Sequence, residues 1–303
     1  MFRSPVPPHQ QRAELKERLA SGQLLRFPGA FSPLVATAIE RASFEGVYIS
    51  GAVLSADLAL PDIGLTTLTE VTQRAQQIAR VTSLPAIVDA DTGFGEPMSA
   101  ARTVTLIEQA GLAGLHLEDQ VNPKRCGHLD HKEVVDTTTM TRRIGAAVNA
   151  RADDNFLIIA RTDSRAIEGV DAAIERCKAY VDAGADVIFP EALRNLGEFE
   201  AVRSAIDVPI LANMTEFGKS DLFSTTQLSN IGVNIVIYPV TTLRLAMGTV
   251  VQSLERLRDD GDQRELVPEM QTRAELYELL NYERYNQFDS NIYNFSPGGT
   301  DES

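Results

Sequence analysis

The length, composition and charge of the chain limit the classes of protein to which it can belong. It has 303 residues, 44% of them hydrophobic, which is enough for one large domain with its own core. Its 42 acidic and 28 basic residues give a net charge of −14, which repels nucleic acids and anionic lipid surfaces. We therefore expect neither as a partner, and we expect a single domain over residues 1–303 with flexible ends at about 1–8 and 296–303.

The cysteine content points to a reducing compartment. Cys126 and Cys177 are the two cysteines, and so few do not build the disulfide framework of a small secreted domain. The N-terminus lacks the apolar core of a signal peptide, and no run approaches the ~20 apolar residues of a membrane span. These features predict a soluble cytoplasmic protein.

Eight short apolar runs alternate along the chain with longer segments that carry apolar residues at helical spacing. The runs are Leu24–Pro28, Gly46–Ser50, Ala86–Asp91, Gly114–Glu118, Phe156–Thr162, Asp186–Glu191, Pro209–Met214 and Asn234–Tyr238. Each is continuously apolar, which is typical of parallel strands covered on both faces. Between them, segments such as Ser99–Ala110 and Val170–Ala183 predict helices. The pattern predicts an α/β fold of the (β/α)₈ barrel type, with an open doubly wound sheet as the alternative.

Polar side chains end most of the predicted strands. In chain order they are Ser50, Asp89, Asp91, Glu118, Arg161, Asp163, Glu191, Asn213 and Thr215. Barrel enzymes carry their catalytic groups at the C-terminal ends of the strands and in the loops that follow. The spacing therefore predicts an active site at that end of the barrel.

Four acidic residues form a candidate metal site. Asp89 and Asp91 follow one strand, Glu118 ends the next, and Asp62 lies in a turn after Pro61. Strand alternation would place Asp89 and Asp91 on the same face, and such oxygen ligands suit Mg²⁺ or Mn²⁺. The alternative is that these carboxylates cap helices or remain solvated.

The segment from Lys124 to His128 is a candidate catalytic loop. Cys126 lies there beside Lys124, Arg125 and His128, and positive neighbours favour the thiolate. A general acid or base needs only reach and a suitable pKa, whereas a nucleophile also needs a positioned base, so we favour proton transfer by Cys126. Cys177, on a predicted helix, fits a small buried hydrophobic residue.

These motifs resemble the isocitrate lyase and phosphoenolpyruvate mutase superfamily, and within it the 2-methylisocitrate lyases most closely. The resemblance runs over nearly the whole chain and rests on Lys124–His128, Val88–Gly95, Leu60–Asp62, Gly114–Gln120, Ala160–Asp163, Phe189–Ala192, Ala212–Glu216 and Met270–Arg273. It implies a (β/α)₈ barrel whose final helix packs on a neighbouring subunit of a homotetramer. It also implies Mg²⁺ held by Asp89 and Asp91, with Asp62 and Glu118 contributing through water.

The resemblance assigns the remaining site residues. The substrate contacts that it implies are Ser50, Gly51, Ala52, Cys126, Gly127, Arg161, Glu191, Asn213, Met214, Thr215, Arg244 and Arg273. The catalytic residues that it implies are Cys126, with His128 and Lys124 on a mobile lid, and Tyr48, Arg161 and Glu118. The chain departs from the family at Ala52, where a second glycine is usual. Alanine can still offer its N–H, but it adopts a left-handed backbone less readily than glycine.

The implied reaction is a retro-aldol cleavage of a small di- or tricarboxylate. We expect 2-methylisocitrate to yield pyruvate and succinate, as in the methylcitrate cycle of propionate catabolism. Arginines suit the substrate carboxylates, and Mg²⁺ suits the oxyanion of the 2-oxo acid half. The alternatives are an oxaloacetate hydrolase, an isocitrate or dimethylmalate lyase of the same superfamily, and a barrel that binds without catalysis.

Overall fold

The structure is a computed structural model that describes residues 6–127 and 131–294. By its internal contacts the chain divides into two compact units, residues 2–247 and residues 248–303. A single domain over the whole chain therefore stays a prediction. Most of the predicted flexible ends lie outside the described residues, but the first helix already begins at Pro8.

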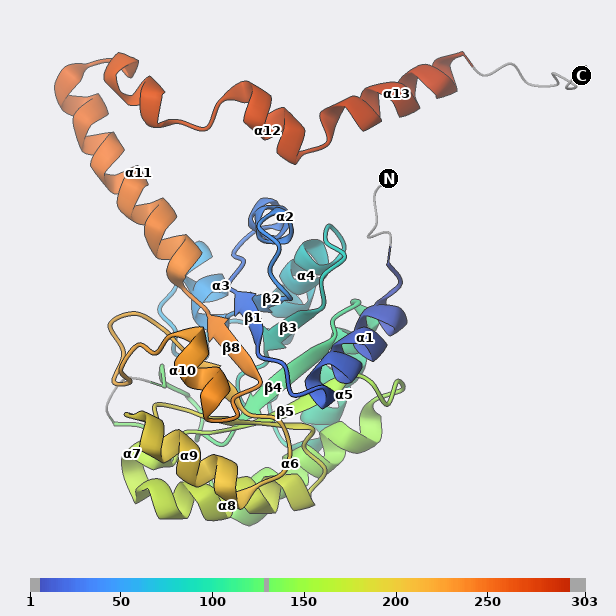
Figure 1. The fold of residues 1–303 in the computed structure, drawn as a ribbon, viewed down its shortest axis with the longest axis vertical. Coiled ribbons are helices and arrows are strands. Elements are labelled where there is room, and N and C mark those ends of the chain that lie inside the picture. The colour runs from blue at the N-terminus through green and yellow to red at the C-terminus, as the bar shows by residue number, and fades with distance from the viewer. Residues whose placement is uncertain (1–5, 128–130, 295–303) are drawn as a thin grey trace, which may run out of the picture. The chain divides into compact units, whose positions relative to one another are not determined.

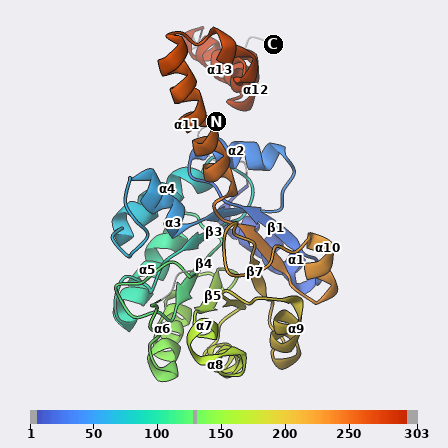
Figure 2. The ribbon, with the colours of Figure 1, turned by 90° about the vertical axis from the view of Figure 1, so that its left-hand side faces the viewer.

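Within the described residues, the first unit is a closed barrel of eight parallel strands surrounded by helices (Figure 2). The strands are β1 (Leu25–Pro28), β2 (Val47–Ile49), β3 (Ala86–Asp89), β4 (Gly114–Glu118), β5 (Leu157–Thr162), β6 (Val187–Pro190), β7 (Leu211–Asn213) and β8 (Ile235–Tyr238). Strands β2 to β6 pair in chain order, and β8 pairs with both β7 and β1. Single parallel bridges, Gly29 to Tyr48 and Ile188 to Ile210, join these two runs into a ring. The predicted barrel is confirmed, and the open sheet is excluded.

One helix precedes β1, and the others follow the strands around the outside of the barrel (Figure 1). They are α1 (Pro8–Ala20), α2 (Pro33–Arg41), α3 (Gly51–Asp57), α4 (Leu68–Ala79), α5 (Pro97–Gln109), α6 (Thr137–Ala150), α7 (Arg165–Glu168), α8 (Val170–Asp182), α9 (Leu196–Ala205) and α10 (Thr225–Asn230). Local sequence explains several of their starts. Thr67 and Glu70 form a capping box at α4, and the side chain of Asp136 caps α6.

The core has two layers, as continuously apolar strands require. Side chains such as Phe27 and Ile159 fill the barrel interior together with Leu15 and Leu19 of α1. The opposite strand faces pack against the helices in a second, larger cluster. Arg12 fastens α1 to this frame by donating to the carbonyl of Leu112 at 2.8 Å. The barrel is therefore a filled, rigid support for side chains at its strand ends.

Gly29 closes the barrel where β1 meets the chain after β8, and no larger residue fits there. A Cβ at this position would lie 2.0 Å from the carbonyl oxygen of Pro239. Because the obstacle is backbone, Gly29→Ala should lower the free energy of unfolding by about 1–3 kcal/mol or more. Urea denaturation followed by circular dichroism measures this loss.

Gly145→Ala is the matched control, because no heavy atom lies within 4 Å of a Cβ at that position in α6. Alanine in a helix interior should stabilise the protein by about 0.5–1 kcal/mol. Equal unfolding midpoints for Gly29→Ala and the parent protein would contradict the close approach to Pro239.

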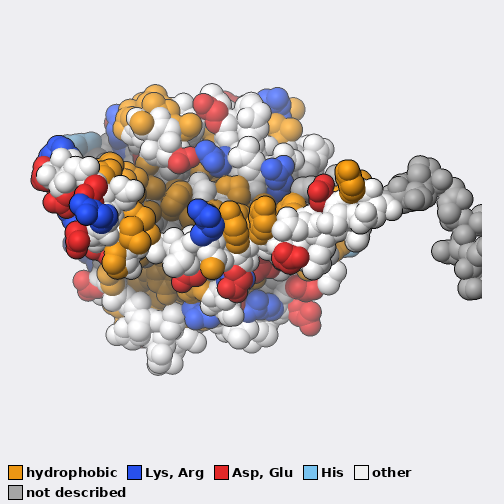
Figure 3. Space-filling model, turned by 90° about the horizontal axis from the view of Figure 1, so that it is seen from above, with side chains coloured by type: hydrophobic (Ala, Val, Ile, Leu, Met, Phe, Trp, Pro, Cys, Tyr) orange, Lys and Arg blue, Asp and Glu red, His pale blue; other side chains and the backbone are white. Residues whose placement is uncertain are grey.

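The second unit contains helices that bury little of their own surface. Helix α11 (Thr241–Asp260) leads into it and is followed by η1 (Arg264–Glu269), α12 (Arg273–Leu279) and α13 (Tyr282–Tyr293). Among described residues 248–294, Leu266 alone is buried. Hydrophobic side chains are visible along the segment that leads to the grey C-terminal residues (Figure 3). In the part of the chain that the structure describes, no helix is both long and apolar enough to cross a membrane.

Candidate active site

The acidic side chains singled out from the sequence gather at the C-terminal ends of β3 and β4. Asp89 accepts the N–H of Gly51 at 3.1 Å and the N–H of Asp91 at 3.0 Å. A Cβ on Gly51 would lie 3.0 Å from Asp89 Oδ2 and 3.3 Å from Asp91 Oδ1, so both carboxylates converge on this glycine. Convergence does not come from strand alternation, because β3 ends at Asp89 and Asp91 has a left-handed backbone with φ 47°.

Lys124 lies inside this carboxylate cluster. Its ammonium contacts Asp62 and lies 2.8 Å from Asp91 Oδ1, and its side chain is almost fully buried. Burial alone would lower the pKa of Lys124, but Glu118 and the three aspartates raise it above its usual value. Burial also raises the pKa of Asp91 to about 6, with a further contribution from Asp89. The cluster is therefore rich in negative charge and already holds one internal cation.

The donor atoms of this cluster fit a divalent cation that prefers oxygen. Both carboxylate oxygens of Glu118 are buried and, among described residues, find no donor with good hydrogen-bond geometry. Within residues 6–127 and 131–294, no three acidic, histidine or cysteine side chains stand close enough together to form a ready-made metal centre. Ligation by one or two carboxylates with water and substrate oxygens suits Mg²⁺ under these conditions, and zinc less so.

Arg161 forms the second charged centre, beside the first. Its guanidinium binds Asp163 through two hydrogen bonds of 2.9 and 3.1 Å. It also lies 3.3 Å from Glu118 and 3.4 Å from Glu191. Burial opposes its charge, but these carboxylates raise the pKa of Arg161 well above its usual value. A permanent positive charge at this depth suits a substrate carboxylate.

Polar groups from β6 and β7 extend the same wall. Asn213 donates to both oxygens of Glu191 at 3.3–3.4 Å, and its own carbonyl oxygen accepts the N–H of Thr215 at 3.0 Å. These contacts hold Asn213 in one orientation, with its amide toward Glu191. The side chains of Asn213 and Glu191 are therefore held in a fixed orientation next to Arg161.

The loop that carries Cys126 is held on both sides of the thiol. The side chain of Gln120 accepts the N–H of Arg125 and donates to its carbonyl, both at 2.8 Å. Lys124 contacts the carboxylate cluster, and the carbonyl of Gly127 accepts a hydrogen bond from Lys132. Cys126 itself is partly exposed, whereas Cys177 is buried in α8, which raises the pKa of its thiol to about 12. Cys126 is therefore the more accessible of the two cysteines.

Tyr48 and His116 form a buried pair behind the carboxylates. The hydroxyl of Tyr48 lies 2.7 Å from His116 Nε2, and the two rings are stacked. Burial raises the pKa of Tyr48 well above its usual value and lowers that of His116 to about 4. Both groups are therefore neutral near pH 7, and Tyr48 acts there as a hydrogen-bonding group rather than as a base.

A pocket of about 50 Å³ joins these parts. It is lined by Tyr48, Ser50, Ala52, Asp62, Asp89, Lys124, Arg125, Cys126, Gly127, Arg161, Glu191, Asn213, Thr215, Pro239 and Val240. A space of this size admits a few water molecules. Gly127 of the cysteine loop lies against Arg161 and Glu191, so the loop covers this part of the pocket.

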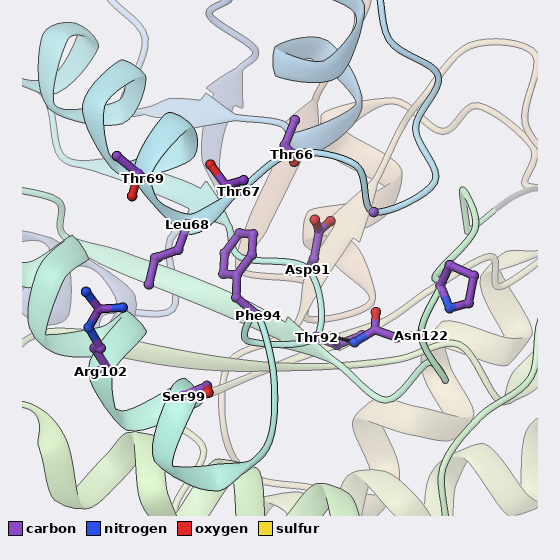
Figure 4. A pocket seen from close by; sticks show the side chains of 12 residues that line it. Thr66, Thr67, Leu68, Thr69, Asp91, Thr92, Phe94, Ser99, Arg102 and Asn122 are labelled. Carbon is purple, nitrogen blue, oxygen red and sulfur yellow. Dashed lines mark hydrogen bonds between the residues drawn. The ribbon is translucent and has the colours of Figure 1, made fainter.

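A second, larger pocket of about 640 Å³ shares the cluster through Asp91. It is lined by residues of the α4 start, the loop after β3 and Asn122 (Figure 4). Figure 4 shows the carboxylate of Asp91 pointing toward the loop that carries Thr66. Asp91 therefore lines this larger pocket, whereas Asp62 and Asp89 line the smaller one.

Some predicted site residues lie elsewhere or outside the described residues. Met214 is buried in the cluster between strands and helices, and Arg244 pairs with Glu216 at 2.8 Å in a half-exposed position. Arg273 begins α12 in the second unit, and His128 lies outside the part of the chain that the structure describes. The roles assigned to these four residues stay predictions.

Ala52 needs no left-handed backbone. It lies inside α3, where the backbone is helical, so alanine is as suitable as glycine there. The glycine that matters is Gly51, which lies against Asp89. The departure from the family pattern therefore leaves this part of the pocket intact.

Sequence reasoning missed the groups that hold the site in place. Gln120, His116 and Lys132 each contact a proposed site residue from a buried position. Asp119 likewise accepts from the N–H of Asp163 at 2.8 Å. The available signal was a polar residue within an apolar strand, as at His116, because such a residue requires a partner. Lys132 gave no comparable signal, since a lysine in a polar loop is usually exposed.

Known proteins with the same fold carry related sequences. The phosphoenolpyruvate phosphomutase family model matches residues 15–258. A Corynebacterium glutamicum protein described as "Probable 2-methylisocitrate lyase 2" is 62% identical, covering 98% of this chain and 96% of its own. A solved structure of oxaloacetate acetylhydrolase with 3,3-difluorooxalacetate is 33% identical with a TM-score of 0.90, covering 96% of this chain and 99% of that one.

A further solved structure is a complex with a metal ion. Phosphonopyruvate hydrolase complexed with oxalate and Mg²⁺ is 31% identical with a TM-score of 0.84, covering 92% of this chain and 98% of that one. The sequence match and the shared barrel agree. The chain belongs to the phosphoenolpyruvate phosphomutase family, within the superfamily that includes isocitrate lyase.

Proposed function

We propose that this protein is a Mg²⁺-dependent lyase that cleaves 2-methylisocitrate into pyruvate and succinate. The observation that carries the proposal is the pocket that Cys126 lines together with Arg161 and two aspartates of the carboxylate cluster, Asp62 and Asp89. The 62% identical relative described as a probable 2-methylisocitrate lyase supports the choice of substrate. The same activity would place the protein in propionate catabolism.

Substrate binding relies on buried positive charge and oriented polar groups. The substrate carries three carboxylates, and Arg161 is held ready for one of them by Asp163. Ser50, Asn213 and Thr215 line the same pocket and can bind the remaining polar oxygens. A rigid arrangement reduces the reorganisation needed when substrate binds.

Bond cleavage requires a base for the alcohol and an acid for carbon. We assign Glu118, whose carboxylate lies beside Arg161 at the end of β4, as the base that takes the alcohol proton. As the oxygen forms the carbonyl of pyruvate, the carbon–carbon bond breaks and its electron pair stays on the succinate half. Cys126 donates its thiol proton to that carbon, and the thiolate remains beside Lys124 and Arg125. The proton on Glu118 returns to the thiolate through solvent after product release.

The metal would be held by Asp89 and Asp91, with Asp62 and Glu118 acting through water. When bound, Mg²⁺ or Mn²⁺ supplies the charge that stabilises the oxygen of the 2-oxo acid half. The related structure of phosphonopyruvate hydrolase, a complex with oxalate and Mg²⁺, supports this assignment. Tyr48 lines the same pocket and would hydrogen-bond the reacting oxygen.

The cysteine loop must open for substrate to reach the strand ends. The pocket beneath it holds a few waters, which is too little for a tricarboxylate. Closure of the loop then removes water from around the carbanion. Otherwise bulk water would protonate the carbanion in place of Cys126. A mobile lid formed by residues 124–128 is therefore part of the proposal.

The test compares purified protein on 2-methylisocitrate, isocitrate, 2,3-dimethylmalate and oxaloacetate, with Mg²⁺ and with EDTA. We expect the highest kcat/KM for 2-methylisocitrate, with pyruvate and succinate in equal amounts, and loss of activity with EDTA. Undiminished activity after metal removal would refute the metal's role. Failure to cleave 2-methylisocitrate while another substrate turns over would refute the substrate assignment.

Oxaloacetate hydrolysis is the second candidate. The structural similarity to oxaloacetate acetylhydrolase, with a TM-score of 0.90, favours it. In that reaction water attacks a carbonyl, so acetate and oxalate appear instead of pyruvate. Release of acetate from oxaloacetate in the same assay would support this alternative.

We also propose a homotetramer in which the C-terminal helices pack on a neighbouring subunit. In the described part of the second unit, large apolar side chains such as Leu254, Val267 and Phe288 are 59%, 56% and 44% exposed. Such surface on an isolated chain would favour association. Light scattering after gel filtration should give four times the chain mass of 33.1 kDa. Leu254→Glu should lower that mass.

The proposed compartment is the cytoplasm. Cys126 must be a thiol to carry a proton, and neither cysteine is joined in a disulfide within the described residues. Reducing compartments keep such thiols free. Fractionation of the native cells with an antibody against this chain tests the location.

A further inference from the structure

We infer that Lys132 is a positioning residue, which joins the loop that carries Cys126 to the carboxylate that orients Arg161. The meaning of this contact for catalysis rests on the proposed function. The contact itself does not, so it can be tested without substrate.

The ammonium of Lys132 has two partners from different parts of the chain. It donates to the carbonyl oxygen of Gly127 and lies 2.9 Å from Asp163 Oδ1. The side chains of Lys132 and Asp163 are 1% and 0% exposed. A buried lysine with two oxygen partners is oriented by them, because an unpaired buried ammonium is costly.

The first partner fixes the loop directly beside the thiol. Gly127 follows Cys126, and a Cβ at Gly127 would lie 2.4 Å from Arg161 Nη2 and 2.6 Å from Glu191 Cγ. The backbone at Gly127 thus lies directly on these two side chains. Holding its carbonyl holds the loop closed over Arg161.

The second partner fixes the guanidinium. Asp163 binds Arg161 through Nε and Nη2, and its backbone N–H donates to Asp119 at 2.8 Å. Asp163 Oδ1 is shared, since it faces both Arg161 Nη2 at 3.1 Å and Lys132. Lys132 therefore restrains the loop and the substrate-binding arginine through one charge.

Charge balance gives Lys132 a second role in this inner layer. Arg161 meets three carboxylates, from Asp163, Glu118 and Glu191. Lys132 offsets one of these negative charges, as Lys124 does for the aspartates on the other side of the loop. Without Lys132, Arg161 would be drawn more strongly to Asp163, and the carbonyl of Gly127 would lose its donor.

The experiment measures alkylation of Cys126 by iodoacetamide, read by peptide mass spectrometry, and steady-state cleavage of 2-methylisocitrate with Mg²⁺. In Lys132→Met, iodoacetamide should alkylate Cys126 at least about tenfold faster than in the parent protein. The reason is that the charge-assisted hydrogen bond from Lys132 to the loop is lost. The kcat of this variant should fall about 10²-fold, since a shift of about 1 Å at a positioned group has that effect. KM should change less than kcat.

Two further variants separate charge from volume. Lys132→Arg keeps the cation and should recover most of the lost kcat and slow alkylation again. Lys132→Gln is smaller and neutral, and provides a second test of accelerated alkylation if Lys132→Met does not fold. Lys178→Met is the control, because Lys178 is half-exposed on α8 and pairs only with nearby Glu175 in the described structure. It should behave as the parent protein.

Alkylation of folded Lys132→Met or Lys132→Gln at the parental rate would overturn the inference. A kcat of Lys132→Met equal to that of the parent protein would also overturn it, because methionine fills the same space without charge. If the parent protein fails to cleave 2-methylisocitrate, the proposed function fails. The alkylation comparison would still decide the role of Lys132.

Discussion

Cys126→Ser is expected to lower kcat for 2-methylisocitrate by about 10²–10⁴-fold, the usual contribution of a general acid. A serine hydroxyl is a far weaker acid than a thiol, so it cannot supply the proton to the succinate carbanion in time. The fold and the affinity for Mn²⁺ should change little, because Cys126 is partly exposed and lies outside the carboxylate cluster. Turnover, circular dichroism and Mn²⁺ titration measure the three properties.

Cys177→Ser is the matched control. Cys177 is fully buried against the helices and lines neither pocket described above, so this change should cost stability but not kcat. Full activity in Cys126→Ser would eliminate the thiol as proton donor. Loss of Mn²⁺ binding in that variant would show that the loop, rather than the proton, was disturbed.

Arg161→Met is expected to abolish measurable cleavage and to destabilise the protein by about 3–5 kcal/mol. The guanidinium is the shared partner of Asp163, Glu118 and Glu191, and its removal leaves buried charges without their counter-ion. Activity fails because the substrate loses its charged anchor. Urea denaturation and the pyruvate assay measure the two effects.

The stability loss should depend on pH in a defined direction. In the parent protein, burial favours protonation of Asp163, but the charges of Arg161 and Lys132 outweigh it and lower its pKa. A carboxyl whose pKa is lowered by folding stabilises the protein above its unfolded pKa, near 3.9, and loses that contribution as the pH falls further. The difference between parent and Arg161→Met should therefore be largest near neutral pH and shrink below about pH 4.

Arg74→Met is the control for this prediction, because Arg74 makes a surface pair with Asp57. Such pairs contribute at most about 1 kcal/mol. A loss no larger in Arg161→Met than in Arg74→Met would show that Arg161 is not the centre of a buried charge network.

The barrel could be predicted from the sequence because its signal is local and repeated. Runs such as Gly114–Glu118 are apolar at almost every position, and each strand that they predict is present. Several strands are shorter than expected, as at Ala86–Asp91, where β3 ends at Asp89. The turn at Asp91, with a left-handed backbone, depends on contacts with Gly51 and Lys124 that no local pattern reveals.

The site could be predicted in part, for the same reason. Asp89, Glu118 and Arg161 stand at strand ends, and the barrel topology brings all strand ends together. The supporting contacts could not be predicted, because Lys132 meets Asp163 only through the fold, 31 residues away in the chain. Arg273 is the opposite case. The motif Met270–Arg273 suggested a substrate contact, but Arg273 begins α12 in the second unit, so this role stays a prediction.

The most direct test of proton donation by Cys126 is cleavage of 2-methylisocitrate in D₂O with Mg²⁺, followed by analysis of the succinate. Delivery from Cys126 to one face of the carbanion predicts one deuterium per succinate, in a single configuration. Deuterium divided equally between the two configurations would mean protonation by bulk water and would contradict the account.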